Sequence, residues 1–378
     1  MPRMPGACWI RGVPASLDAA VREASAILRR AERPAFGGLA TDVGGVRALL
    51  DLAEQRGAIV DHMNGHAMLR NTLSFQRNGW MTTTFAEVRN RADMIVVAGT
   101  DVVSRFPRFF ERIAFGDAMF VRDAERAVVF VGQPAVPDGV AAAGGGACQR
   151  IACDNPALAA VFGALAGIVG GTVTGDGSIA GVPLATLRVL AERMRAARYG
   201  VLVWVAADLQ FPHAELAVDA MCDCVRALNV ETRFAALPLA GNDADTTVHQ
   251  VCVWQTGYPP WLSFAGGSID YDPYRFGIEQ ALGSGDADAL LWIASFDAER
   301  APPPTGVPTI VLSRPGPGRA PAPDVRIDVG VPGLDHAGHF FRGDAVVAVR
   351  LQRAVESSLP SVADVVRRIA AEIEGCPC

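Results

Sequence analysis

Short runs of apolar residues alternate with longer amphipathic segments along most of the chain. The short runs are rich in β-branched residues and show no alternation with polar ones, which is typical of parallel strands buried on both faces. We predict strands at residues 33–38, 58–60, 94–99, 128–131, 201–205, 232–236, 289–293, 309–312 and 325–327. The amphipathic segments predict helices at residues 16–30, 42–56, 107–113, 183–198, 212–228 and 362–373. This order predicts an α/β protein in which helices cover parallel sheets.

One uncharged stretch, residues 155–175, is long enough to be considered as a membrane span. It consists mostly of alanine and glycine and is interrupted by Gly170-Gly171. It therefore predicts a buried helix followed by a loop, and we expect no membrane partner.

The composition narrows the functional classes. Half of the 378 residues are hydrophobic, and a chain of this length usually forms about two domains. The net charge of −6 argues against a nucleic-acid-binding protein, which usually has an excess of basic residues. The chain has no lysine, which excludes a lysine Schiff base and a Walker-A phosphate loop. Eight cysteines are too few for a disulfide scaffold and residues 1–20 lack a signal-peptide pattern, so we expect a cytoplasmic protein with reduced thiols.

Two turns that follow predicted strands contain glycine and polar residues. In the first, residues 37–42, Gly38 and Thr41 could help to cradle a phosphate at the start of the next helix. The alternative is a tight strand–helix turn without a ligand. In the second turn, Thr100 and Asp101 follow the strand at residues 94–99. Asp101 could bind a ligand hydroxyl, or it could cap the next helix.

Two residue pairs have the composition of metal ligands but not the expected geometry. His62 and His66 are four residues apart, which on a helix would suit Zn²⁺, but Asn64-Gly65 between them favours a turn. Cys222 and Cys224 lie two apart in a predicted helix and therefore point to different faces. We predict no metal site and read these residues as loop histidines and packing cysteines.

Two groups of side chains are candidates for contact with a partner or an anionic ligand. One group is basic and has helical spacing, and the other is aromatic and surrounds a glycine turn. The groups are Arg105, Arg108 and Arg112, and Trp254, Tyr258 and Trp261. Aromatic and arginine side chains are common anchors in protein interfaces. The alternatives are a solvated helix face with salt bridges and a loop packed over its own domain.

Several segments together resemble the B subunit of formylmethanofuran dehydrogenase, a family similar in fold to molybdopterin oxidoreductases. The resemblance covers residues 20–355 in consistent order and is carried by residues 87–99, 105–112, 254–259, 285–293 and 336–344. It implies two Rossmann-like parallel-sheet lobes, one of them inserted in the other. The implied boundaries are residues 15–60 with 240–355 for the first lobe, 61–239 for the inserted lobe and 356–378 for a C-terminal helix and tail.

Departures from the family pattern bear on the chemistry. The redox enzymes begin with a cysteine cluster that holds a [4Fe–4S] centre, whereas only Cys8 precedes Cys148 here. They also carry a cysteine or selenocysteine metal ligand after the second strand, whereas Asp61–Ala67 contains no cysteine. We therefore expect that the iron–sulfur domain, the [4Fe–4S] centre and the molybdo- or tungstopterin have been lost. The expected relic cleft comprises Gly38, Thr41, His62, His66, Thr100 and Asp101.

This combination resembles the B subunit of the bacterial formyltransferase/hydrolase complex. The resemblance implies a non-catalytic scaffold that assembles with subunits A, C and D. It also implies that the complex converts formyl-tetrahydromethanopterin to formate through a methanofuran-type carrier, with zinc on another subunit. Two alternatives stay open: an active molybdo- or tungstopterin dehydrogenase subunit, and a module that binds the carrier methylofuran.

Overall fold

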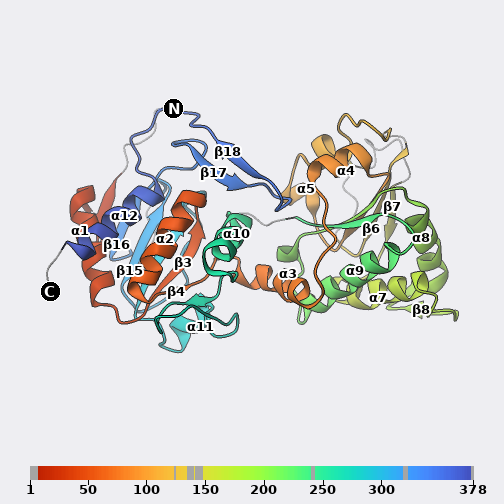
Figure 1. Ribbon diagram of the computed structural model, residues 1–378, viewed down its shortest axis with the longest axis horizontal. Helices are drawn as coiled ribbons and strands as arrows, with labels where there is room; N and C mark the ends of the chain where they lie inside the picture. The colour runs from red at the N-terminus through yellow and green to blue at the C-terminus, as the bar shows by residue number, and fades with distance from the viewer. Residues whose placement is uncertain are drawn as a thin grey trace. The chain divides into compact units, whose positions relative to one another are not determined.

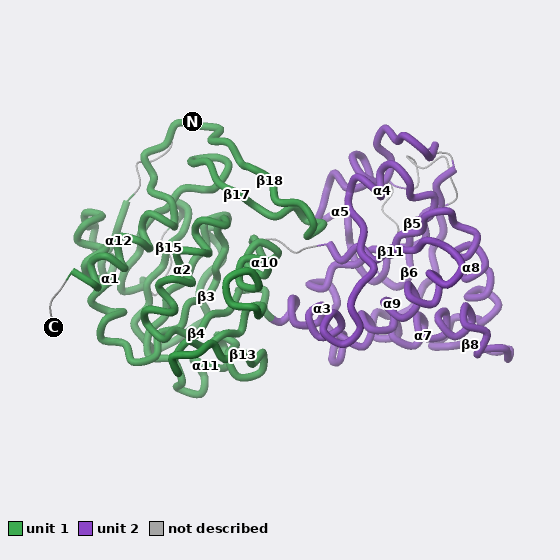
Figure 2. Tube along the Cα trace, viewed as in Figure 1, with its two compact units in different colours: residues 1–65, 242–378 green, residues 66–241 purple. Residues whose placement is uncertain are grey.

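The chain forms two compact units, one of which is discontinuous in sequence (Figure 2). Unit 1 contains residues 1–65 and 242–378, and unit 2 contains residues 66–241. The computed structural model describes residues 7–122, 125–133, 140, 148–239, 243–317 and 322–375. The tail expected at residues 376–378 lies outside the described residues.

Unit 1 is built on a nine-stranded sheet with the order β13-β12-β4-β3-β14-β15-β16-β1-β2. The five middle strands are parallel, and the strand pairs at both edges are antiparallel. The strands are β1 (Cys8–Ile10), β2 (Val13–Ala15), β3 (Pro34–Ala40), β4 (Ile59–Val60), β12 (Leu262–Ser263), β13 (Asp270–Tyr271), β14 (Ala289–Ala294), β15 (Thr309–Ser313) and β16 (Val325–Asp328).

The helices of unit 1 begin and end at residues suited to these positions. They are α1 (Leu17–Arg30), α2 (Val43–Arg56), α10 (Asp245–Thr256), α11 (Ile278–Gly283) and α12 (Val362–Glu374). Ser16 caps α1, Ser361 forms a capping box at α12, and Gly57 ends α2 in the left-handed conformation. The C-terminal helix α12 packs on α1 and α2 and belongs to the core of this unit (Figure 1). A separate hairpin is formed by β17 (Gly338–Phe341) and β18 (Ala348–Leu351).

Unit 2 is built on a five-stranded, fully parallel sheet with the order β11-β10-β5-β6-β7. Its strands are β5 (Met94–Ala98), β6 (Ala127–Val131), β7 (Cys148–Ile151), β10 (Gly200–Trp204) and β11 (Phe234–Pro238). One apolar layer joins this sheet to α7 (Leu158–Val169), α8 (Leu184–Ala196) and α9 (Ala214–Leu228). A second layer on the opposite face contains side chains of α4 (Phe85–Arg91), α5 (Val102–Arg105) and the π-helical turn η1 (Phe110–Ala114). The remaining elements are α3 (Gly65–Asn78), η3 (Asn155–Ala157), η4 (Ala206–Asp208) and the hairpin β8 (Ser178–Ile179) and β9 (Val182–Pro183).

The predicted parallel strands are all present, but one predicted helix is wrong and the sequence pattern misses several others. The helix expected at residues 107–113 is replaced by the short α5, which ends at Arg105, and by η1. The turn expected at Asn64-Gly65 leads directly into α3, a helix that the sequence pattern does not predict. The uncharged stretch at residues 155–175 forms α7 followed by a loop, as expected. No helix among the described residues is long and apolar enough to cross a membrane.

Candidate functional site

Each parallel sheet has one position at which the strand order reverses. In unit 1 this position lies between β3 and β14, and in unit 2 it lies between β5 and β10. Ligands of open α/β sheets bind outside the carboxyl ends of the strands at such a switch point. The residues that follow β3 and β5 include Thr41, Thr100 and Asp101, so these three predicted relic-cleft residues lie at the two switch points.

Gly38 does not belong to a phosphate-binding turn, which corrects the sequence-based expectation. It lies inside β3, in the left-handed conformation with a φ of +76°. A Cβ at this position would overlap the Ile293 carbonyl oxygen and lie 2.9 Å from the Ile293 nitrogen. The pairing of β3 with β14 shifts register here, between Trp292 and Ala294. Gly38 therefore allows two central strands to approach each other.

The start of α2 is closed by the chain's own groups. Thr41 is completely buried, and its hydroxyl finds no hydrogen-bond partner among the described residues. Asp42 is the N-cap, and its Oδ1 accepts a hydrogen bond from the Gly45 amide at 3.0 Å. The backbone of β17 packs directly on this carboxylate, because a Cβ on Gly338 would lie 3.1 Å from Asp42 Cγ. The Asp42 carboxylate and the backbone of β17 therefore occupy the start of this helix, where a phosphate would bind.

His62 is a buried structural histidine. Its side chain is held between the Asp243 carbonyl oxygen, 2.8 Å from Nε2, and the Asn64 amide, 3.0 Å from Nδ1. The Asn64 amide can only donate, so Nδ1 is the acceptor and Nε2 carries the proton. Burial lowers the pKa of His62 to about 4, and the nearby Arg300 acts in the same direction. Both ring nitrogens are therefore engaged and unavailable to a metal.

Arg300 connects the segment that contains His62 to Asp243, which lies close to the point where the chain returns to unit 1. Its Nη2 lies 2.9 Å from Asp243 Oδ2 and donates to Asn64 Oδ1 at 2.5 Å, while Nε lies 3.1 Å from Met63 Sδ. Asp243 has a φ of +64°, which is uncommon for aspartate. Burial raises the pKa of Asp243, and Arg300 opposes this change. No local pattern in the sequence indicates this cluster.

His66 and His62 do not form a helical ligand pair. His66 lies in the first turn of α3 and is exposed, whereas His62 precedes the helix and is buried. The turn between them, which the sequence predicts, leads directly into this helix. Among the described residues, no group of three or more potential ligands is arranged to hold a metal ion.

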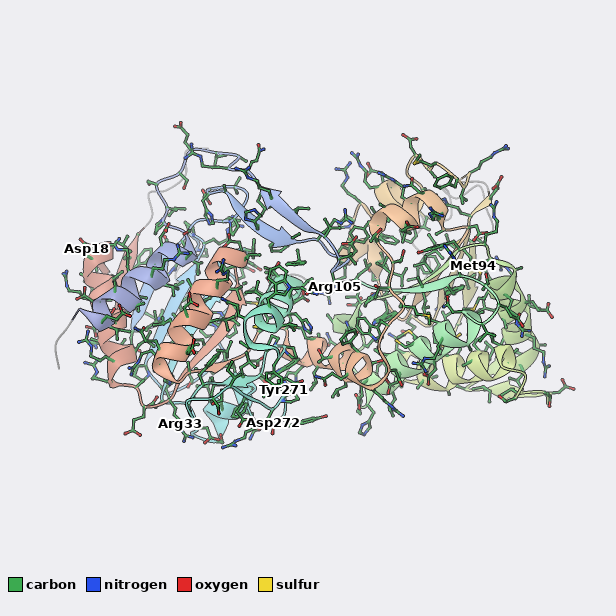
Figure 3. All side chains as sticks on the ribbon, in the orientation of Figure 1. Asp18, Arg33, Met94, Arg105, Tyr271 and Asp272 are labelled. Carbon is green, nitrogen blue, oxygen red and sulfur yellow. The ribbon has the colours of Figure 1, made fainter. Side chains whose placement is uncertain are left out.

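At the switch point of unit 2, Asp208 is the central residue. Arg105, at the end of α5 (Figure 3), donates to Asp208 Oδ1 from Nε at 2.9 Å and from Nη2 at 2.7 Å. The Thr100 hydroxyl donates to Asp208 Oδ2, and the Asp101 amide lies 3.3 Å from the same oxygen. The Asp101 side chain caps α5 by accepting from the Ser104 amide at 3.0 Å, so the capping alternative describes it correctly.

The other two arginines of the predicted basic cluster are paired with the same carboxylate. Arg108 donates to Glu111 at 3.1 and 2.8 Å, and Arg112 lies 3.0 Å from Glu111 Oε1. The hydrogen bonds between Arg108 and Glu111 lower the pKa of Glu111 and raise the pKa of Arg108. The three arginines lie in α5, in the turn that follows it and in η1, and do not form the single helix face that their spacing predicts.

The aromatic candidates differ in exposure. Trp254 is 59% exposed on α10, and its ring packs edge-on to Phe341 of β17. Tyr258 is 44% exposed and stacks on Tyr271, with ring centroids 5.5 Å apart. Trp261 is only 2% exposed, which corrects its assignment as a contact residue. Trp254 and Tyr258 stay candidates for contact with a partner.

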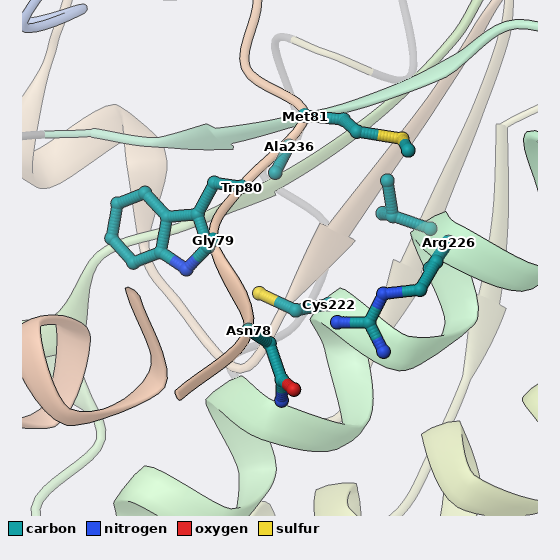
Figure 4. Close-up of a pocket in the computed structure, with 8 residues that line it drawn as sticks. Asn78, Gly79, Trp80, Met81, Cys222, Arg226 and Ala236 are labelled. Carbon is teal, nitrogen blue, oxygen red and sulfur yellow. The ribbon is translucent and has the colours of Figure 1, made fainter. Parts of the chain in front are cut away.

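Two surface cavities lie away from the switch points. In unit 2, a cavity of about 240 Å³ is enclosed by the end of α3, by α9 and by Ala236 of β11 (Figure 4). Cys222 lines it, but burial raises the pKa of this thiol to about 11, so it is not a nucleophile at neutral pH. In unit 1, a cavity of about 390 Å³ is lined by residues of both charge signs, including Arg33 and Asp286 in an ion pair of 3.2 Å. Neither cavity is lined by a site residue that the sequence predicts.

A molybdo- or tungstopterin, which the family resemblance implies for the redox enzymes, does not fit the described residues. The loop at residues 61–64 offers no thiolate, and the Met63 thioether is in contact with Arg300. At the start of α2 the Gly45 amide is bonded to Asp42, and after β5 the Thr100 hydroxyl is bonded to Asp208. We therefore derive no chemistry through such a group.

Comparisons with known proteins agree with this description. No protein-family model matches the chain. The chain is 31% identical over 341 residues to the B subunit of the formyltransferase/hydrolase complex Fhc of Methylorubrum extorquens, covering 89% of this chain and 88% of that protein. It is 23% identical over 347 residues to the B subunit of tungsten-containing formylmethanofuran dehydrogenase 2 of Methanocaldococcus jannaschii, covering 90% of this chain and 79% of that protein.

Solved structures show the same relationship. A chain in the crystal structure of the Methylorubrum extorquens formyltransferase/hydrolase complex with methylofuran superposes with a TM-score of 0.83 and 28% identity, covering 97% of this chain and 99% of that chain. Acetylene hydratase of Pelobacter acetylenicus shares the fold alone, with a TM-score of 0.59, 11% identity and coverage of 96% and 59%. The predicted fold class, parallel-sheet α/β as in molybdopterin oxidoreductases, is confirmed. The protein described here belongs to the family of B subunits of formyltransferase/hydrolase complexes.

Proposed function

We propose that this chain is a non-catalytic scaffold subunit of a formyltransferase/hydrolase complex. Its partners in this proposal are subunits A, C and D, and the complex converts formyl-tetrahydromethanopterin to formate through a methanofuran-type carrier in the cytoplasm. The observation that carries the proposal is the match to the B subunit of the Fhc complex, which spans 89% of this chain and 88% of that relative. Catalytic zinc would belong to another subunit.

The geometry of the strand ends supports a scaffold over an active dehydrogenase. Asp42 accepts a hydrogen bond from the Gly45 amide at the start of α2, and Asp208 accepts hydrogen bonds from Thr100 and Arg105 after β5. His62 is buried, and its two ring nitrogens are engaged. We infer that units 1 and 2 are the two lobes expected for this family, and that the C-terminal helix α12 is part of the first lobe.

The carrier-binding alternative has less support. Arg105 is paired with Asp208, and Arg108 and Arg112 share Glu111, so all three guanidinium groups already face carboxylates. An anionic carrier would have to displace these carboxylates. We therefore place the carrier on other subunits, and we expect exposed Trp254 and Tyr258 to contact protein partners.

The first test of the proposal is the metal content of the purified complex. We expect this chain to contribute no molybdenum, tungsten or iron, because Asp61–Ala67 contains no cysteine and Cys8 is the only cysteine before Cys148. Elemental analysis of the isolated complex, normalised to the amount of this chain, measures this directly. About one molybdenum or tungsten atom per chain would contradict the scaffold assignment and favour the dehydrogenase.

A second test uses turnover by the intact complex. We expect His66→Ala and Asp101→Ala, made singly, to change formate production by less than about threefold, because removing a group that stabilises a transition state usually costs about 10²- to 10³-fold. Formate release from the formylated pterin is measured after the stoichiometry of the subunits has been checked. A hundredfold loss for either variant in a fully assembled complex would show that this chain takes part in the chemistry.

A further inference from the structure

The switch point of unit 2 contains a complete set of anion-binding donors. The segment from β5 to α5 contributes the Thr100 hydroxyl, the Asp101 backbone amide and the Arg105 guanidinium. Arg105 donates from Nε and Nη2, at 2.9 and 2.7 Å, to the same carboxylate oxygen, which leaves the second oxygen to the other two donors. A guanidinium, a hydroxyl and a backbone amide that converge on one point form a typical receptor for an oxyanion.

The group that occupies this receptor comes from a different part of the chain. Asp208 lies in η4, directly after β10, on the other side of the switch point. Its Oδ1 accepts from Arg105, and its Oδ2 accepts from Thr100 and faces the Asp101 amide. Its side chain is 17% exposed, and that of Arg105 is 33% exposed. The three donors and Asp208 therefore lie on separate segments at one edge of the sheet, and the ion pair of Arg105 with Asp208 is partly shielded from solvent.

The short loop between β10 and Asp208 fixes the position of the carboxylate. The amide of Asp208 donates to the Val205 carbonyl at 3.0 Å, which closes the η4 turn. A carboxylate held in this way is presented to Arg105 at an effective concentration in the millimolar range or higher. A free anion of similar chemistry must compete with it and does not bind at ordinary concentrations.

We propose that Thr100, Asp101 and Arg105 form a latent anion site, which Asp208 occupies as an internal ligand. The site takes a small carboxylate or another oxyanion when the Asp208 side chain is removed. In the native chain Asp208 blocks the site, so an external anion cannot bind at the position where an open α/β sheet receives its ligand. This assignment concerns unit 2 alone and goes beyond the proposed role in the complex.

The test is rescue of Asp208→Ala by formate, which replaces the carboxylate that the substitution removes. The full chain is unfolded thermally in sodium formate and in sodium chloride of equal ionic strength. An anion that binds only the folded chain is expected to raise Tm by roughly 3 °C when its concentration is about ten times its dissociation constant. The wild type should gain less than about 1 °C under the same conditions, because its site is occupied.

Asp223→Ala is the matched control. It also removes an aspartate from an arginine pair in unit 2, since Arg226 donates to Asp223 at 2.7 Å, but Asp223 is exposed and no hydroxyl or amide donor to its carboxylate is found among the described residues. We expect no specific gain with formate in this control. The double variant Asp208→Ala/Arg105→Gln should lose most of the gain, because the strongest donor is missing.

Direct binding is followed by saturation-transfer NMR of the formate proton, which we expect to detect with Asp208→Ala and not with the wild type. Where Asp208→Ala is not recovered in a folded form, Asp208→Ser is used with the same criteria. The proposal is overturned if formate stabilises Asp208→Ala no more than Asp223→Ala, or if the gain persists without Arg105. These outcomes do not depend on partner chains, so they are distinguishable from failure of the scaffold assignment.

Discussion

Replacing Gly38 by alanine is expected to lower the free energy of unfolding of unit 1 by about 3 kcal/mol. Gly38 has a φ of +76°, a conformation that costs an L-residue about 1–2 kcal/mol. A Cβ there would also overlap the Ile293 carbonyl oxygen, and forcing atoms into a packed core costs about 1–3 kcal/mol more. The strand β14 would have to move away from β3 at the centre of the sheet.

Gly257→Ala is the control for this substitution. Gly257 ends α10 with a φ of +82°, but no atom lies within 4 Å of the position that a Cβ would occupy. Gly257→Ala should therefore lower the free energy of unfolding by only about 1 kcal/mol, which is the cost of the left-handed conformation alone. Urea unfolding monitored by tryptophan fluorescence compares the two variants with the wild type. Equal losses for both would mean that the close approach of Gly38 to Ile293 has no energetic consequence.

The same glycine illustrates how far local sequence reasoning reaches. The apolar run before it correctly predicts a strand, because uninterrupted apolar residues indicate burial on both faces. The glycine pair predicts the end of that strand, whereas β3 continues to Ala40. The reason for the glycine is the Ile293 backbone, which is more than 250 positions away in the sequence. No local pattern carries that information.

The helix termini are predictable from the sequence, since capping depends on neighbouring residues. Ser16, Asp42 and Gly57 occupy the caps that their residue types favour. The prediction of a helix at residues 107–113 is wrong because tertiary packing of Phe109 and Phe110 in the core replaces a regular helix with a π-helical turn. Short antiparallel strands near the sheet edges, such as β1 and β12, escape prediction because runs of two or three residues carry little periodicity.

The sequence predicts the position of the candidate site but not its content. Thr100, Asp101 and Arg105 are candidates because of their place after a buried strand and their spacing, and the structure brings them together around Asp208. Asp208 is not among the predicted residues, although a polar residue after an apolar strand is a detectable signal. The contacts of Arg300 have no such signal, because it meets Asn64 and Asp243 only through the tertiary fold.

Acidification from pH 6.5 to pH 4 is expected to destabilise the protein, and His62 is one of two buried histidines that contribute to this loss. Burial lowers the pKa of His62 from 6.5 to about 4. Below pH 6.5 the unfolded chain therefore binds a proton that the folded chain does not bind. The stability that this neutral histidine maintains is fully present above pH 6.5 and is lost as the pH falls towards 4. The loss approaches about 3 kcal/mol, with a slope of about 1.4 kcal/mol per pH unit.

Urea unfolding of the wild type and His62→Gln between pH 6.5 and 5 measures this contribution, in a range where most carboxylates stay ionised. Glutamine can still donate to the Asp243 carbonyl oxygen but does not titrate. The free energy of unfolding of the variant should therefore depend less steeply on pH, by the amount that one proton contributes. Burial also lowers the pKa of His249 to about 4, so this residue is the second group that titrates in the range. We expect His249→Gln to remove the contribution of His249 to the pH dependence of stability, independently of His62. An unchanged slope in His62→Gln would contradict a buried neutral imidazole. Because a His62 that binds metal or substrate would instead need an accessible ring nitrogen, the same measurement separates a structural histidine from a functional one.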